Sequence, residues 1–225
     1  MSARDDVYAG IRRSLAVSAD DALRRDVARA RIEEARGGLR PKRGDGDQAQ
    51  RIATFSAQAQ GVNASISIVD SLADAVREIA AFLREHNLPA QVRIGADDRL
   101  TQLNWSGSAI EISEGVSSGD DLSSVSHAEA GVSETGTLVI VSGAHNPSTL
   151  NFLPDNHIAI LRGADIVPVY EDAFALLRAR YGKGEMPRTV NLVTGPSRSA
   201  DIEQKLLLGA HGPRRLHILI VQSDT

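Results

Sequence analysis

The sequence predicts an α/β fold: a three-layer, mainly parallel sheet with helices on both faces, preceded by an N-terminal helical arm. From residue 61 onward, short apolar runs rich in β-branched side chains alternate with longer stretches of helical period, the pattern of parallel sheets covered by helices. A strand pair within residues 123–141 reads as a hairpin, so we expect a mixed sheet. The 225 residues, of which 42% are hydrophobic, suffice for one sizeable domain and an appendage.

Two helices are predicted ahead of that domain, over residues 4–16 and 20–36. The second is rich in arginine interleaved with acidic residues, and its apolar face is thin. It is either a solvated helix laced with ion pairs or an arm that docks on a partner. The polar run 40–48, RPKRGDGDQ, is the best boundary in the chain. We therefore divide the chain into a helical arm, 1–47, and an α/β domain, 48–225.

The domain begins with a helix over residues 48–59. Further helices are predicted at 71–85 and 171–181, where apolar residues recur at helical spacing. Residues 123–133 alternate small and polar side chains ahead of a turn. The remaining apolar runs predict strands at 62–69, 91–94, 109–112, 137–141, 157–161, 166–169, 190–193 and 216–221.

The stretch 190–213 reads as a strand, a tight Gly-Pro loop and a helix that stops at a second Gly-Pro pair. A loop leading from the carboxyl end of a strand into a helix is where open α/β sheets bind ligands, and the free N–H groups there favour anions. Arg198 adds a guanidinium that suits a carboxylate or phosphate. Alternatively, the serines only cap the helix and Arg198 pairs with Asp201. We predict a small-anion site formed by Gly195, Pro196, Ser197, Arg198 and Ser199.

Two further groups are candidates for chemistry. Glu134, Thr135 and Gly136 form a turn in which Glu134 could act as a base and the other two residues could bind ligand. A plain hairpin turn with a solvated glutamate explains the same residues. His211 either lines the cleft of Arg198, as a second catalytic candidate, or caps the end of the predicted helix.

Other polar residues have weaker signals. His127 and Glu129 stand two apart, so on a strand they face the same way. They could provide a base or a metal pair, but a hydrogen-bonded pair is more common and no metal site is predicted. The polar loop 146–151 could close over a ligand or simply connect two elements. His217 lies in an apolar strand and reads as a core histidine.

Composition excludes several classes of function. The chain has no cysteine, so it holds no disulfide, thiolate nucleophile or iron–sulfur cluster of its own. A net charge of −4 gives no reason to expect nucleic-acid binding. No apolar run reaches membrane-spanning length, and the first residues have no signal core, so we expect a cytoplasmic protein. The missing G-x-G-x-x-G motif argues against direct nicotinamide chemistry, and the cofactor stays unknown.

Four segments together resemble the LUD-domain family, once described as a domain of unknown function. They are HAEAGVSETGTLVIVSG, LPDNHIAIL, IVPVYEDA and TGPSRSADIEQKLLLGAHGPRRLHILIV. The resemblance covers roughly residues 60–223, and its last thirty-five residues are the most specific part. It implies the fold shared by ribose-5-phosphate isomerase, glucosamine-6-phosphate deaminase and CoA transferases.

The resemblance also implies a function. Members of this family serve in a cytoplasmic complex that oxidises L-lactate to pyruvate, with iron–sulfur subunits on separate chains or domains. We therefore expect a subunit without clusters that binds a small anionic metabolite at the Ser197–Arg198 loop and has iron–sulfur partners. The family carries over no catalytic residue, so whether this chain is itself an enzyme stays open. The alternatives are a stand-alone enzyme acting on a phosphorylated or acyl metabolite, or a non-catalytic small-anion-binding protein.

Overall fold

The computed structural model describes residues 2–18, 20–34, 38–182, 184–202 and 205–223. The chain comprises two compact units, Met1–Leu39 and Arg40–Thr225.

The first unit contains two helices, α1 (Ala3–Ser14) and α2 (Ala22–Glu34), which confirms the two helices predicted there. Helix α1 begins with a capping box, in which Ser2 and Asp5 satisfy each other's free N–H groups. The predicted end of the second helix lies outside the described residues. None of the described residues in either helix is buried. The apolar side chains of the unit are therefore exposed, namely Val7, Tyr8, Ile11, Leu15, Leu23, Val27 and Ile32.

The second unit starts at Arg40, so residues 40–47, which the sequence analysis assigned to the arm, lie in it. Arg40 Nη2 donates to Asp172 Oδ2 at 2.6 Å. Gly44 packs so closely that a Cβ there would lie 2.1 Å from the carbonyl oxygen of Pro168. Asp47 then caps helix α3 (Gln48–Gly61) through a capping box.

The main sheet is entirely parallel, as neighbouring strands show in every pairing. Its strands run from edge to edge in the order β1-β12-β7-β4-β2-β3. They are β1 (Ser65–Ser71), β2 (Gln91–Ile94), β3 (Glu111–Glu114), β4 (Ser123–His127), β7 (Asn156–Arg162) and β12 (Arg215–Ser223). The predicted parallel sheet is confirmed.

Helices cover one face of this sheet. After the 3₁₀ turn η1 (Leu72–Asp74), helix α4 (Ala75–Glu85) packs Ile79, Phe82 and Leu83 onto the sheet, and α5 (Asp98–Thr101) adds Leu100. The 3₁₀ turn η2 (Trp105–Gly107) adds Trp105 to the same core.

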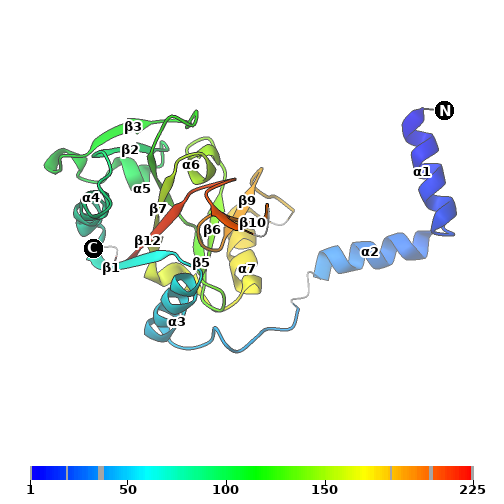
Figure 1. The fold of residues 1–225 in the computed structure, drawn as a ribbon. Helices are drawn as coiled ribbons and strands as arrows, with labels where there is room; N and C mark the ends of the chain where they lie inside the picture. The colour runs from blue at the N-terminus through cyan, green and yellow to red at the C-terminus, as the bar shows by residue number, and fades with distance from the viewer. Residues whose placement is uncertain (1, 19, 35–37, 183, 203–204, 224–225) are drawn as a thin grey trace. The chain divides into compact units, whose positions relative to one another are not determined.

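The opposite face is covered by α3 together with a second sheet (Figure 1). That sheet has the order β8-β5-β6-β9, with one parallel and two antiparallel pairings. Its strands are β5 (Ala130–Val132), β6 (Thr137–Val141), β8 (Ile166–Val167) and β9 (Val190–Val193). The hairpin β5–β6 was predicted, but the expectation that it joins the main sheet is wrong, because it belongs to this separate sheet.

Helix α7 (Tyr170–Tyr181) packs Ala173 and Leu177 on the second sheet. Two short elements complete the connections, α6 (Thr149–Phe152) and the 3₁₀ turn η3 (Gly163–Asp165).

The helix predicted within residues 197–210 is wrong. That stretch forms an antiparallel hairpin, β10 (Arg198–Ile202) and β11 (Lys205–Leu208), with Arg198 paired to Leu208. The main-chain bond from Gly209 N–H to the Ser197 carbonyl closes the base of the hairpin. The turn between the two strands lies outside the described residues.

His217 is the core histidine that the sequence predicts. It lies on β12 and is 4% exposed, its ring stacks on Phe82 with centroids 4.5 Å apart, and its Nδ1 bonds to Ser65 Oγ at 2.8 Å. Burial lowers the pKa of His217 to about 4. The ring is therefore neutral at pH 7 in the folded protein.

This burial makes stability depend on pH. Between pH 4 and 6.5 the unfolded chain binds more protons at His217 than the folded chain does, so stability falls as the pH falls. When the pH is lowered from 7.5 to 5, the free energy of unfolding should fall in both the wild type and a His217→Gln variant. We expect the fall in the variant to be smaller by about 2 kcal/mol. Urea titrations at both pH values measure this. An equal fall in the two proteins would show that His217 is not buried as a neutral ring.

Candidate functional site

The main sheet has a topological switch point between β2 and β4. From β2 the chain moves outward to β3, then crosses back to β4 and continues toward β7 and β12. Loops that leave the carboxyl ends of strands at such a point diverge and leave a crevice. Here a cavity of about 460 Å³, the switch-point pocket, is lined by residues that include Asp97, Asp98, Arg99, Glu129, Asn146 and Tyr181.

A network of ion pairs, the ion-pair chain, forms part of the wall of the switch-point pocket. Glu129 is 4% exposed and accepts a hydrogen bond from Arg99 Nη2 at 2.8 Å, and its other oxygen pairs with Arg180 Nη1. Arg99 also binds both oxygens of Asp97, at 2.9 Å from Nε and 2.6 Å from Nη2. The chain of charges therefore ties the loop after β4 to α5 and to the last turn of α7.

His127 lies beside this chain of charges at the end of β4 and is 3% exposed. Burial, with Arg99 as the next cause, lowers the pKa of His127 to about 3, so the ring is neutral. The described residues show no hydrogen bond between His127 and Glu129, and Nδ1 of His127 has no partner among them. Within the described ranges no group of three or more metal-ligating side chains is placed to hold a metal ion.

The turn at Glu134 packs against α3. Glu134 is 5% exposed, and Arg43 Nε donates to its Oε2 at 3.2 Å. Gly136 has a φ of +65°, and a Cβ there would lie 2.3 Å from the main-chain nitrogen of Ala59, so the turn requires glycine. The hydroxyl of Thr135 joins a cluster with the hydroxyls of Thr137 and Tyr170. Neither the switch-point pocket nor the pocket described next is lined by this turn.

The predicted anion loop lies elsewhere than expected. It follows β9 of the second sheet and borders the amino ends of β7 and β12. The expectation that it lies at the carboxyl ends of the parallel strands, where open α/β sheets bind ligands, is therefore wrong. A cavity of about 260 Å³, the β9-loop pocket, brings the predicted residues Gly195, Pro196, Ser197, Arg198 and His211 together. Ser199 is the next residue along β10 and does not line the cavity.

Local contacts fix the β9 loop. Gly195 has a φ of +80°, and a Cβ there would lie 2.5 Å from the Val62 carbonyl oxygen. The guanidinium of Arg198 donates to that same carbonyl. The main-chain N–H of His211 donates to Ser197 Oγ at 3.4 Å, so the imidazole of His211 stays at the exposed rim.

Two buried polar side chains also line the β9-loop pocket; the sequence placed Asn151 in a loop that could close over a ligand, but His157 was not assigned to this site. Asn151 on α6 and His157 on β7 both line it, and each is only 1% exposed. Within the described ranges neither amide atom of Asn151 has a hydrogen-bond partner, and the same holds for Nδ1 of His157. The sequence feature that could have indicated these two residues is their position beside the start of an apolar strand, in the run NFLPDNH.

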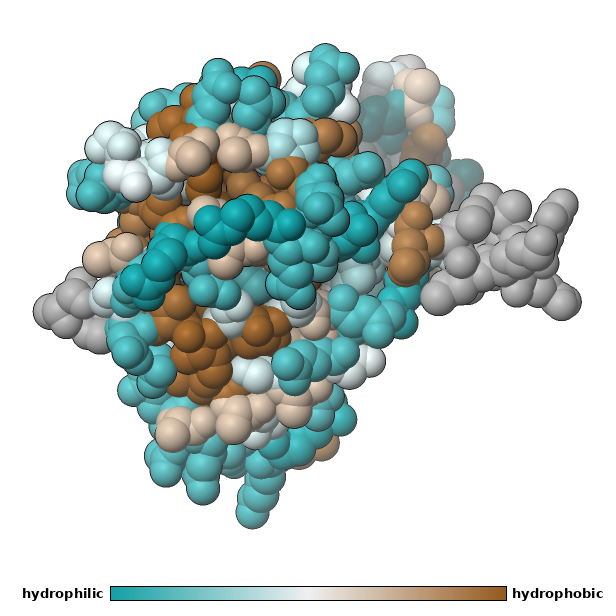
Figure 2. All heavy atoms as spheres, turned by 60° about the vertical axis from the view of Figure 1, so that its left-hand side comes forward, coloured by the Kyte–Doolittle hydropathy of each residue, from teal (hydrophilic) through white to brown (hydrophobic). Residues whose placement is uncertain are grey.

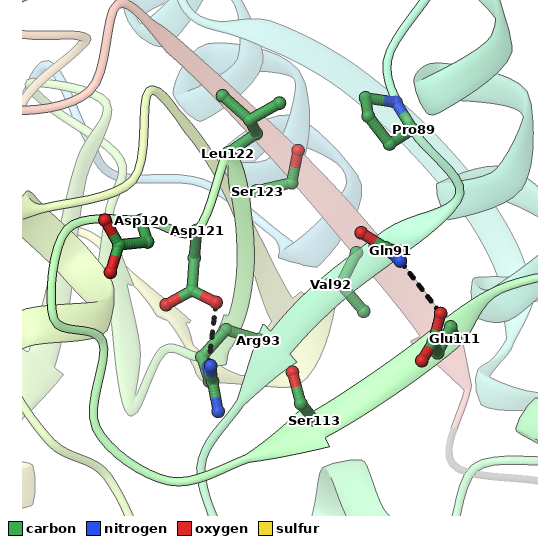
Figure 3. A pocket seen from close by; sticks show the side chains of 10 residues that line it. All are labelled: Pro89, Gln91, Val92, Arg93, Glu111, Ser113, Asp120, Asp121, Leu122 and Ser123. Atoms are coloured by element: carbon green, nitrogen blue, oxygen red, sulfur yellow. Dashed lines mark hydrogen bonds and ion pairs between the residues drawn. The ribbon is translucent and has the colours of Figure 1, made fainter.

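A third hollow of about 290 Å³ lies where β2 and β4 diverge, because these strands pair only at Arg93 and Ile94 of β2 (Figure 3). Figure 3 shows Arg93 bonded to Asp121, at 2.9 Å, and Gln91 bonded to Glu111, at 2.8 Å. With Asp120 the described lining has three carboxylates and one cation. Such a hollow does not suit an anion.

Around these hollows the surface is mixed. Figure 2 shows apolar patches separated by hydrophilic side chains. Large exposed apolar residues of the second unit include Ile68, Val116 and Leu122, which are 47%, 65% and 50% exposed. No helix among the described residues has the length and hydrophobicity needed to cross a membrane.

The chain resembles known proteins in both sequence and fold. Residues 123–221 match the family model of the LUD domain, which confirms the resemblance predicted from the sequence. A crystal structure of a DUF162 family protein from Deinococcus radiodurans is similar to this chain, with a TM-score of 0.59 at 20% identity. The match covers 79% of this chain and 99% of that one. At that identity the likeness shows the fold alone.

Relatives of this chain in sequence include proteins named lactate utilization protein C. The one from Geobacillus sp. (strain WCH70) is 41% identical over 91 residues, which cover 40% of this chain and 38% of that protein. The one from Bacillus licheniformis is 36% identical over 99 residues, or 44% of this chain and 41% of that protein. The matched stretch thus spans about two fifths of the length of these relatives, and the homology is distant.

Breaking the ion-pair chain tests its role. We expect Glu129→Gln to lower the free energy of unfolding by about 2 kcal/mol, because Arg99 and Arg180 lose their buried partner. The loss stays below the roughly 3–5 kcal/mol of a fully buried pair, because both guanidinium groups reach solvent. Urea denaturation measures the change. Glu111→Gln, on an exposed carboxylate, is the matched control and should change stability by less than about 0.5 kcal/mol. Equal stability of the two variants would contradict a clamping role.

Proposed function

We propose that this chain serves in lactate utilization as a cytoplasmic subunit that binds a small carboxylate anion in the β9-loop pocket. The distant homology to proteins named lactate utilization protein C supports the process. The location rests on one observation. The described residues that line the β9-loop pocket include one cation, Arg198, and no carboxylate. The switch-point pocket and the hollow between β2 and β4 each contain three carboxylates and a single arginine. A further hollow of about 560 Å³, which contains Arg188, also lacks a carboxylate, but none of its described lining residues is buried.

The chemistry of Arg198 supports this role. A guanidinium has five N–H donors in a fixed plane and binds carboxylates through parallel hydrogen bonds. The contact with the Val62 carbonyl holds the group at the rim of the pocket. A volume of about 260 Å³ is just below the usual range of ligand pockets, roughly 300–1,000 Å³, and so suits a small metabolite.

Partners follow from the electron balance. Oxidation of L-lactate to pyruvate releases two electrons and two protons, and a chain without cysteine holds no iron–sulfur cluster. In this proposal, separate iron–sulfur subunits carry the electrons. The exposed apolar side chains of Val7 and Ile11 on α1, and of Leu15 at its C-terminal end, support the first unit as the docking arm.

A second candidate function is favoured by the switch-point pocket. Open α/β enzymes bind substrates at that place, so a stand-alone enzyme acting on a phosphorylated or acyl metabolite is the alternative. The three carboxylates that line this pocket favour an acyl over a phosphorylated metabolite there. Such an enzyme would keep its activity without residues 1–39. The complex subunit would lose its partners on that deletion.

The β9-loop site is tested by Arg198→Ala. We expect the dissociation constant for L-lactate to rise about 10- to 100-fold, because a charge-assisted hydrogen bond is worth roughly 1.5–3 kcal/mol. Isothermal titration calorimetry on the full chain measures it. Arg77→Ala is the control, since Arg77 is an exposed arginine on α4 that pairs with Asp74. Unchanged affinity in Arg198→Ala would place the anion elsewhere.

The complex is tested by purifying the tagged chain from lactate-grown cells. We expect cysteine-rich partners, iron and lactate-dependent dye reduction to co-purify. Deletion of residues 1–39 should remove the partners, whereas Arg198→Ala should keep them and lose the activity. Recovery of the chain alone, without iron or activity, would refute the proposed complex.

A further inference from the structure

Among the residues that the structure describes, the side-chain amide of one lining residue of the β9-loop pocket has no hydrogen-bond partner. Asn151 is 1% exposed, and within the described ranges both its Nδ2 and its Oδ1 lack a hydrogen bond. A buried polar group left unpaired is costly, so such groups normally meet a partner. Asn146 provides a contrast in the same connection, because its Nδ2 donates to the Val141 carbonyl at 2.8 Å. Asn146 thus has a structural role, while both N–H donors and the carbonyl oxygen of the Asn151 amide are left for an occupant.

His157 adds a second polar group to the floor. Its Nε2 lies 2.6 Å from Ser126 Oγ, and Ser126 is fully buried. Among the described residues, this ring nitrogen is the only hydrogen-bond partner of the Ser126 hydroxyl. The hydroxyl hydrogen is satisfied only if Ser126 donates, so Nε2 accepts and the ring hydrogen resides on Nδ1. Burial lowers the pKa of His157 to about 4, so the ring is a neutral N–H donor at pH 7.

The described groups therefore form a graded site. A cation stands at the rim, and the floor offers two N–H donors, Asn151 Nδ2 and His157 Nδ1, with one acceptor, Asn151 Oδ1. A carboxylate needs only donors, whereas a hydroxyl group both donates and accepts. The unpaired acceptor Oδ1 has no use in binding a plain carboxylate. It suits a ligand that also carries an O–H or N–H group.

We propose that Asn151 and His157 are the specificity-determining residues of this pocket, and that they select a 2-hydroxy acid by its hydroxyl group. This inference rests on the proposed function, since it assumes that Arg198 holds the carboxylate. The ligand hydroxyl donates to Asn151 Oδ1 and accepts from His157 Nδ1–H. Ser126 is a positioning residue, because it fixes the ring hydrogen of His157 without lining the pocket.

A ligand series on the unaltered full chain tests this selection. L-lactate carries the hydroxyl, pyruvate has a carbonyl oxygen that only accepts, and propionate has neither. We expect affinity in the order L-lactate, pyruvate, propionate, with propionate at least about 10-fold weaker than L-lactate, because a site built for a hydroxyl leaves its own groups unpaired when the hydroxyl is missing. Isothermal titration calorimetry at pH 7 measures all three.

Variants then assign the effect to residues. Asn151→Leu should reduce the preference for L-lactate over propionate to less than about 3-fold, while binding of propionate itself changes little. Ser126→Ala should also narrow the preference without touching the ligand. Asn104→Leu is the matched control, since Asn104 lines none of the three hollows. Because Asn151 makes no side-chain bond within the described protein, Asn151→Leu should fold with an unchanged or higher Tm.

The outcomes separate the two proposals. Equal affinity for L-lactate and propionate, both weakened in Arg198→Ala, would overturn this inference and leave the proposed function standing. Absence of binding by any of the three acids would refute the β9-loop site itself. A preference that survives unchanged in Asn151→Leu would also overturn the assignment. The order L-lactate, pyruvate, propionate, lost in that variant, supports it.

Discussion

Burial of the central strands on both faces is the constraint on which the rest of the structure depends. On β7, Ile158 and Ile160 face one core, while Ala159 and Leu161 face the other. A parallel sheet of this kind must be covered on both sides. Helices α4 and α5 cover the first side, but α3 is the main helix on the second. The second sheet completes that cover, and its strand β9 delivers the β9 loop to the amino ends of β7 and β12.

The switch-point pocket and the β9-loop pocket lie at opposite ends of the parallel strands and have different electrostatics. In the switch-point pocket the arginines are already paired, since Arg99 bridges Asp97 and Glu129. An incoming anion would compete with two carboxylates for the same guanidinium group. The β9-loop pocket has no such competitor among its described lining residues. Its floor is polar but uncharged, because burial keeps His157 neutral. The proposed function therefore places the carboxylate at the rim beside Arg198, with the rest of the ligand directed inward.

The sequence was sufficient to predict most strands of the main sheet, but not the arrangement of the layers that cover it. Residues 137–141 and 216–221 are strongly apolar runs that can only be buried strands, and both predictions are confirmed. The separation of β5–β6 into its own sheet was not predictable, because it depends on which strands pair across long stretches of chain. The apolar positions of residues 202–210 fit a helical period, yet pairing of Arg198 with Leu208 decides for a hairpin. The spacing of apolar residues along the chain does not reveal this pairing between strands.

Most residues of the predicted anion loop line a pocket, but the helix start from which the anion site was predicted is absent from the described structure. Ser197 and Arg198 line a pocket, but no helix begins there, so no helix dipole contributes. The Ser197 N–H is bonded to the Pro213 carbonyl, and the Gly209 N–H to the Ser197 carbonyl. The main-chain donors that a helix start would leave free are therefore consumed. The anion recognition that we propose for this pocket would therefore depend on side chains. They are a guanidinium at the rim, whose charge salt screens, and buried neutral donors on the floor, whose hydrogen bonds are less sensitive to salt.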